Sequence, residues 1–163
     1  MATAKISYPA TGSAITITLN SLASSGTVGR ASTAIDNSTN LDLDALVQVQ
    51  LSQSASAVAN DKAIYVYAYG SIDGTTYPEG ITGTDASYTI LGSAGALTTA
   101  LRLIGAIPAV ASDTNYHGPF AVAPAFGGVL PVKWGIIVLN FGGQTLAASG
   151  NAATYTRVQA TVA

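Results

Sequence analysis

Residues 63–70 read AIYVYAYG and carry the clearest strand pattern in this chain. Aliphatic side chains alternate there with tyrosines, Ile64, Val66 and Ala68 against Tyr65, Tyr67 and Tyr69. Successive side chains of a strand point to opposite faces of a sheet, and β-branched and aromatic residues favour a pleated surface. The pattern therefore predicts a strand with an aliphatic face on a core and a tyrosine face turned away from it.

A second alternating segment precedes it, residues 43–52, LDALVQVQLS. Aliphatic residues occupy one face of this segment and Gln48 and Gln50 the other, which predicts a half-buried strand. Further runs with strand character are separated by clusters of Gly, Pro, Asn and Ser, which favour turns. These runs are residues 14–19, 101–107, 116–122, 133–140 and 152–162.

Helical spacing of apolar residues is found only in the Ala-rich stretch 93–104, where we expect a short helix at most. Many short strands joined by Gly and Pro turns are typical of sandwiches and jelly rolls. We therefore predict an all-β fold, a jelly-roll-like antiparallel β-sandwich over residues 14–163. Residues 1–13 are predicted to be a short N-terminal arm, either disordered alone or lying along a neighbouring subunit.

Charged residues are scarce in this chain. They make up 9% of the sequence, against roughly 25% in an ordinary soluble domain. Because dissolved monomers usually carry an interspersed charged surface, the composition predicts that part of this surface is covered, and hence a homo-oligomer. Lys and Arg form no cluster, which argues against a nucleic-acid partner. No apolar run is long enough to predict a membrane span or a secretory signal, and without cysteine disulfides are excluded.

No residue pattern predicts catalysis, a cofactor or a metal. His117 is the only histidine, and without cysteine or a second histidine it lacks the partners of a zinc site. The segment 36–44, DNSTNLDLD, offers Asp36, Asn37, Asn40 and Asp42 as oxygen ligands, but it lacks the glycine and terminal glutamate of a calcium loop. Asp42 and Asp44 are more simply explained as turn residues before a strand. We therefore expect a protein that is not an enzyme.

Two sets of residues are candidate partner contacts. Tyr65, Tyr67 and Tyr69 offer large apolar rings with polar tips, which suit a sugar-stacking platform or a subunit interface. The alternative is that another segment of the same chain covers them. In the predicted arm, Ile6, Tyr8 and Pro9 are suited to lying extended on a neighbour.

Residues 71–77, SIDGTTY, resemble a hairpin found in extracellular β-sandwich and carbohydrate-binding domains. Asp73-Gly74 is also a common dipeptide of tight turns. The segment is therefore either a ligand loop or a simple chain reversal.

The C-terminal third resembles a known family. Residues 130–158, LPVKWGIIVLNFGGQTLAASGNAATYTRV, are similar to the closing segment of small β-sandwich virion proteins of tailed bacteriophages, with a P-x-K-W strand, a loop containing LAASGN and a final strand containing tyrosine. Residues 68–80, AYGSIDGTTYPEG, and 101–109, LRLIGAIPA, are similar in style to the middle of those proteins.

The resemblance implies a structural virion protein, a capsid decoration or cement protein on the outer capsid surface, with the major capsid protein as partner. A neck or tail location remains open. By the same resemblance we expect a homo-oligomer, a trimer before a dimer. The alternative is a carbohydrate-binding or host-adhesion module of a phage particle. A glycan-degrading enzyme has least support, because the chain offers no well-placed pair of carboxylates.

Overall fold

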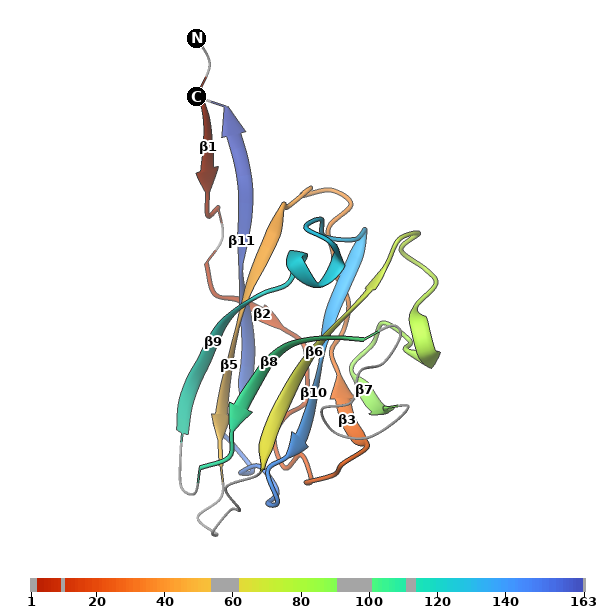
Figure 1. Ribbon diagram of the computed structural model, residues 1–163, viewed down its shortest axis with the longest axis vertical. Coiled ribbons are helices and arrows are strands. Elements are labelled where there is room, and N and C mark those ends of the chain that lie inside the picture. Colours follow the sequence, from red (N-terminus) through yellow and green to blue (C-terminus); the bar gives the residue numbers. More distant parts are fainter. Residues whose placement is uncertain (1–2, 10, 54–61, 91–100, 111–113, 163) are drawn as a thin grey trace.

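The computed structural model describes residues 3–9, 11–53, 62–90, 101–110 and 114–162, which form two antiparallel sheets packed as a sandwich (Figure 1). The first sheet comprises β1 (Ala4–Ser7), β2 (Ser13–Ile15), β5 (Asp44–Ser52), β9 (Thr114–Ala121) and β11 (Ala152–Val162). The second comprises β3 (Val28–Ala31), β4 (Ile35–Asp36), β6 (Ala63–Ser71), β7 (Ala86–Thr89), β8 (Arg102–Pro108) and β10 (Lys133–Phe141). The predicted all-β antiparallel sandwich is confirmed.

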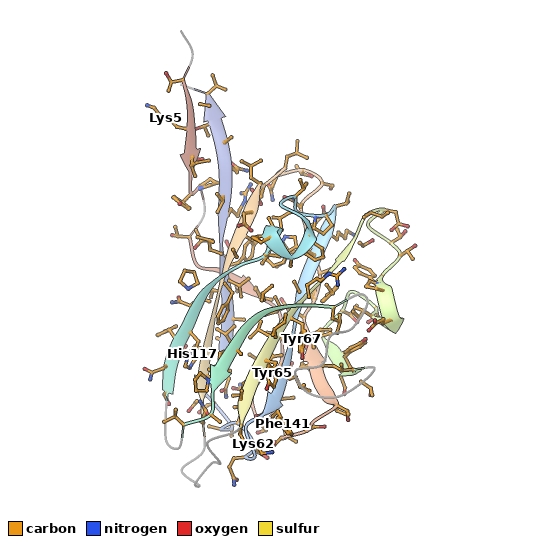
Figure 2. The ribbon with its side chains drawn as sticks, in the orientation of Figure 1. Lys5, Lys62, Tyr65, Tyr67, His117 and Phe141 are labelled. Atoms are coloured by element: carbon orange, nitrogen blue, oxygen red, sulfur yellow. The ribbon has the colours of Figure 1, made fainter. Side chains whose placement is uncertain are left out.

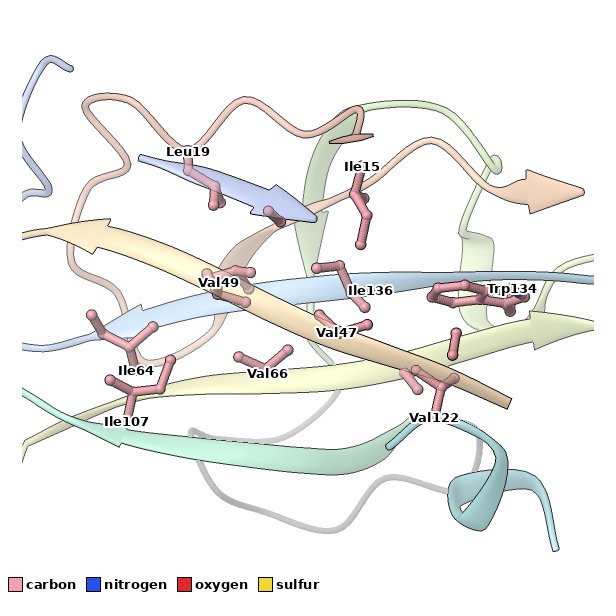
Figure 3. Packing of buried hydrophobic residues seen from close by; sticks show 14 of the residues in the cluster. Ile15, Leu19, Val47, Val49, Ile64, Val66, Ile107, Val122, Trp134 and Ile136 are labelled. Carbon is pink, nitrogen blue, oxygen red and sulfur yellow. The ribbon is translucent and has the colours of Figure 1, made fainter. Parts of the chain in front are cut away.

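The inner core lies between the two sheets (Figure 3). Its main side chains are Val47 and Val49 of β5, Ile64 and Val66 of β6, and Ile136 and Trp134 of β10. Each of these side chains is at most 1% exposed. At roughly 1.5–3 kcal/mol for each large apolar side chain removed from water, this layer supplies most of the driving force for folding.

A second cluster, the outer core, covers the opposite face of the second sheet. Ile137 and Leu139 of β10 and Tyr67 and Tyr69 of β6 form its floor. Residues from the segment that follows β6 lie over them, namely Ile81, Tyr88, Ile90 and Leu101. Both faces of β6 and β10 are therefore buried, which explains the nearly continuous apolar run KWGIIVLNF in β10.

Two short 3₁₀ turns connect strands of the sandwich. They are η1 (Pro78–Gly80) after β6 and η2 (Ala123–Phe126) before β10. Of the Ala-rich stretch expected to hold a short helix, residues 93–100 lie outside the described residues, and residues 102–104 belong to strand β8. The short strands β1, β3, β4 and β7 were not predicted, because small residues, charges or brief length leave them without a clear alternation.

The N-terminal segment forms a strand of its own chain. β1 pairs with residues 159–162 of β11, and β2 pairs with residues 153–155 along the same edge. Residues 4–7 of the predicted arm therefore lie along their own β11, and β2 begins at Ser13, one position before the predicted boundary. In Figure 1 β1 and the end of β11 project from the body as a two-stranded ribbon. We call β1 and residues 159–162 the ribbon.

Candidate interaction surface

The polar loop before β5 supports the sandwich with its own hydrogen bonds. The Asn37 side chain accepts from the Asp42 amide at 2.7 Å and donates to the Asp42 carbonyl at 3.2 Å. The Asp42 carboxylate accepts from both Arg157 Nε and Gln159 Nε2 on β11, at 3.0 and 2.8 Å. Asp42 therefore fastens this loop to β11.

The two flanking aspartates are also occupied by protein donors. Asp36 accepts from the hydroxyl and the amide of Ser38, and these bonds hold the pKa of Asp36 below its ordinary value. Asp44 accepts from the backbone amides of Ala45, Val122 and Ala123, so it joins the start of β5 to η2. Within the part of the chain that the structure describes, no group of His, Cys, Asp and Glu side chains could hold a metal ion.

His117 lies on β9, opposite Val49 of β5 and far from the ribbon (Figure 2). Its Nε2 atom is shielded from solvent and has no hydrogen-bond partner among the described residues.

Residues 71–77 form a tight turn around Asp73. The Asp73 carboxylate accepts from the Ser71 hydroxyl and from the amides of Thr75 and Thr76, at 2.7–2.8 Å. These hydrogen bonds, first those from Thr76, hold the pKa of Asp73 well below its usual range. The pattern is that of an aspartate stabilising a chain reversal. A hollow beside it is lined by Asp73 and Tyr77 among others.

The tyrosine row is covered by its own chain. Tyr67 is 1% exposed and Tyr69 is fully buried, while Tyr65 is half-buried. The Tyr69 hydroxyl donates to the Ser32 carbonyl at 2.6 Å, and burial raises the pKa of Tyr69 to about 12. The prediction that these rings contact a partner or a sugar is therefore wrong for Tyr67 and Tyr69. The reason is the outer core, which the intervening segment builds over them.

The other predicted contact residues are accessible. Ile6 is 58% exposed on β1, Tyr8 is 55% exposed just after it, and Pro9 is also exposed. They lie on the projecting ribbon and its connection to β2, where a partner could reach them.

A further set of accessible apolar side chains was not predicted. Its members come from the loops at one end of the sandwich, and we call them the apolar end: Leu41, Leu43, Ile72, Val129 and Val132. Leu41, Leu43 and Val129 line one hollow, and Ile72 and Val129 line the next, so these four side chains are contiguous. In Figure 1 these loops lie at the end from which the ribbon projects.

The backbone conformation of the loop keeps the Leu41 side chain exposed. It is 73% exposed and adopts a φ of 51°, in the left-handed region that a leucine rarely occupies. The Leu41 amide donates to the Asn37 carbonyl, which keeps this conformation in place. A sequence signal for the set did exist, namely large aliphatic residues inside loops otherwise rich in Gly, Asp and Asn.

Charged groups also lie at this end: Arg102 lines the same hollow as Ile72 and Val129, and Asp42 lines the hollow of Leu41 and Leu43. Arg30 of β3 donates to Asp85, which also accepts from Thr18. Burial alone would raise the pKa of Asp85, but the bonds from Arg30 and Thr18 outweigh it and lower that pKa. The Lys133–Asp36 ion pair, at 4.0 Å, is the charged neighbour of Val132. The apolar end combines exposed aliphatic side chains with a few charged neighbours, and such a surface is suited to packing against another protein.

Comparison with known proteins finds no matching family model, no related curated protein and no similar solved structure. None of the described helices is long and apolar enough to cross a membrane.

Proposed function

We propose that this protein is a structural protein of a phage particle, a decoration or cement protein that binds the outer surface of the assembled capsid shell. The main support for the proposal is the exposure of the aliphatic side chains of the apolar end. Only 9% of the residues in this chain are charged. The resemblance of residues 130–158 to small virion proteins supplies the identity of the partner, the major capsid protein. Self-association belongs to the proposal, and the resemblance favours a trimer over a dimer.

The mechanism is mass action. A protein that binds only the assembled lattice shifts the equilibrium toward that lattice by its binding free energy. The effect is multiplied over many copies on one shell, so a modest affinity at each site suffices to stabilise the whole. The two buried cores support a rigid body for this role.

Shell binding tests the proposal. Leu41→Lys and Val129→Lys each place a charge on an exposed side chain of the apolar end, so the fold is kept while the apolar contact is lost. We expect the affinity for purified shells to fall by at least about tenfold, equivalent to about 1.4 kcal/mol. Co-sedimentation with shells, quantified over a concentration series, measures it.

Val110→Lys is the matched control. Val110 is 49% exposed, comparable with Leu43, but it follows β8 at the opposite end of the sandwich (Figure 1). This variant should bind shells as the unmodified chain does. Failure of the unmodified chain to bind shells at all would overturn the proposal.

The alternative is a carbohydrate-binding or host-adhesion module. The hollow beside Asp73 and Tyr77 favours it, because an aromatic ring beside a polar turn is a plausible sugar subsite. Because Tyr67 and Tyr69 are buried, their rings are not available to stack against a sugar. Binding to a host glycan that is lost in Tyr77→Ala and kept in Leu41→Lys would replace the capsid proposal with this one.

A further inference from the structure

Arg102, at the start of β8, is an exposed arginine without a carboxylate of its own. The other arginines, Arg30 and Arg157, form ion pairs with Asp85 and Asp42. Within the described part of the chain, no hydrogen bond or ion pair joins Arg102 to another residue. All the N–H donors of its guanidinium group are therefore available to a partner.

Arg102 lines a hollow whose other lining residues are apolar or glycine. We call it the Arg102 hollow. Its volume is about 530 Å³, and the exposed side chains of Ile72 and Val129 form part of its wall. Recesses of this size that combine an apolar lining with one or two polar groups are typical binding sites.

The floor of the Arg102 hollow is fixed by the fold. A Cβ on Gly70 of β6 would lie 2.5 Å from Pro131 and 3.1 Å from Phe126, so both rings pack against the backbone of β6. The η2 turn, which carries Phe126, is held by the Asp44 carboxylate, which accepts from the Ala123 amide at 2.7 Å. A floor that is already ordered lowers the entropy that is lost when a partner binds.

We propose that the Arg102 hollow receives an acidic side chain of the shell protein together with a large apolar side chain next to it. The carboxylate accepts a bidentate pair of hydrogen bonds from the Arg102 guanidinium group. The apolar side chain packs on Phe126, between Ile72 and Val129. This inference rests on the proposed function, and it names the chemistry of the segment that the capsid partner presents.

Charge complementarity favours a carboxylate as the occupant. A guanidinium group beside an apolar surface repels a second cation and pairs best with a group that accepts two parallel N–H bonds. Arg102 is the one charged residue among those that line the hollow, so the charge of a single carboxylate is enough to balance it.

The acidic residues of this chain favour another protein as the source of that carboxylate. Every carboxylate side chain in the described ranges already accepts a hydrogen bond from its own chain, namely Asp36, Asp42, Asp44, Asp73, Glu79 and Asp85. A second copy of this chain therefore offers Arg102 no described acid without donors of its own.

Two charge reversals in the full chain test the inference. Arg102→Glu replaces the attraction by repulsion, and Lys62→Glu makes the same change in net charge at the end of the sandwich opposite Lys5 and the ribbon (Figure 2). We expect Arg102→Glu to lower the affinity for purified shells by at least about tenfold and Lys62→Glu to change it by less than about twofold. Arg102→Glu should melt as the unmodified chain does, because Arg102 has no hydrogen-bond partner to lose.

Ionic strength supplies a second readout in the same co-sedimentation assay. The shell affinity of the unmodified chain should fall as sodium chloride rises from about 50 mM to about 500 mM, because salt screens the ion pair. The affinity of Arg102→Gln, which lacks the charge, should fall less over the same range.

The outcomes separate this inference from the capsid function. If the unmodified chain binds shells and Arg102→Glu binds them equally well, the inference is wrong and the capsid function stands. If the unmodified chain never binds shells, both proposals fail. A variant Arg102→Glu that keeps its shell affinity but changes its mass in light scattering would show that a second copy occupies the hollow, which also contradicts the inference.

Discussion

At the scale of single residues, Tyr69 shows how a side chain suited to a partner is used inside the fold. Its ring contacts Tyr77 edge-on, with centroids 5.9 Å apart, and a Cβ on Gly135 of β10 would lie within 2.6 Å of the Tyr69 ring. Gly135 therefore leaves the space that the ring fills. The hydroxyl reaches the Ser32 carbonyl, so burial leaves no polar atom of Tyr69 unpaired.

Tyr69→Phe should therefore destabilise the protein by about 1–2 kcal/mol, because the buried Ser32 carbonyl loses its donor. The pH dependence should also change. The pKa of an unfolded tyrosine is about 10, and in the folded chain the pKa of Tyr69 is about 12. The stabilising contribution is therefore complete below about pH 10 and is lost as the pH rises from about 10 to 12.

Urea unfolding at pH 8 and across the alkaline range measures both effects. In Tyr69→Phe the alkaline loss should be smaller but still present, since burial also raises the pKa of Tyr88. Tyr116→Phe is the control, because Tyr116 is 65% exposed. An alkaline profile of Tyr69→Phe identical to that of the unmodified chain would contradict the assignment.

At the scale of elements, β1 differs from every long strand of the sandwich. β5, β6 and β10 supply the inner core, and β6 and β10 also form the floor of the outer core. β1 supplies neither, and its contribution to stability consists of its pairing with residues 159–162.

Deleting residues 2–12 should leave the sandwich folded. We expect the melting temperature to fall by no more than about 4 °C, because roughly 1 kcal/mol corresponds to 2–4 °C in a chain of this size. Self-association should weaken, because the deletion removes the exposed Ile6 and Tyr8. Circular dichroism melting and light scattering measure the two effects, and loss of a cooperative melt would show that β1 has a larger structural role.

At the scale of the whole molecule, the two cores share β6 and β10. If β6 or β10 left its sheet, side chains of both cores would be exposed to water. We therefore expect the described sandwich to unfold as one unit. Trp134, the only tryptophan, is 1% exposed in the inner core and contacts Tyr155 edge-on at 5.3 Å. Its fluorescence therefore reports the inner core alone.

Ile81→Ala tests this coupling from the outer core, where Ile81 is 6% exposed. The substitution should destabilise the protein by about 2–4 kcal/mol and shift the urea midpoint seen by Trp134 fluorescence as much as the midpoint seen by far-ultraviolet circular dichroism. Leu103→Ala, at a 45% exposed position, should shift both midpoints far less. Separate transitions would show that the outer core unfolds independently.

Much of the fold could be predicted from alternation alone. Residues 43–52 and 63–70 correspond to β5 and β6, and the predicted runs at 133–140 and 152–162 correspond to β10 and β11. The candidate surface was predicted less well. Ile6 and Tyr8 are accessible as expected, whereas Tyr67 and Tyr69 are buried and the apolar end was missed.

The sequence by itself determined which residues form the long strands and which side chains share a face, because both follow from a local period of two along the chain. Only the tertiary structure decided what covers each face. Ile81, Tyr88 and Leu101 close over Tyr67 and Tyr69, and no local pattern near residues 63–70 encodes that contact. The meeting of Leu41, Ile72 and Val129 at one end likewise depends on long-range strand pairing, which brings separate loops together.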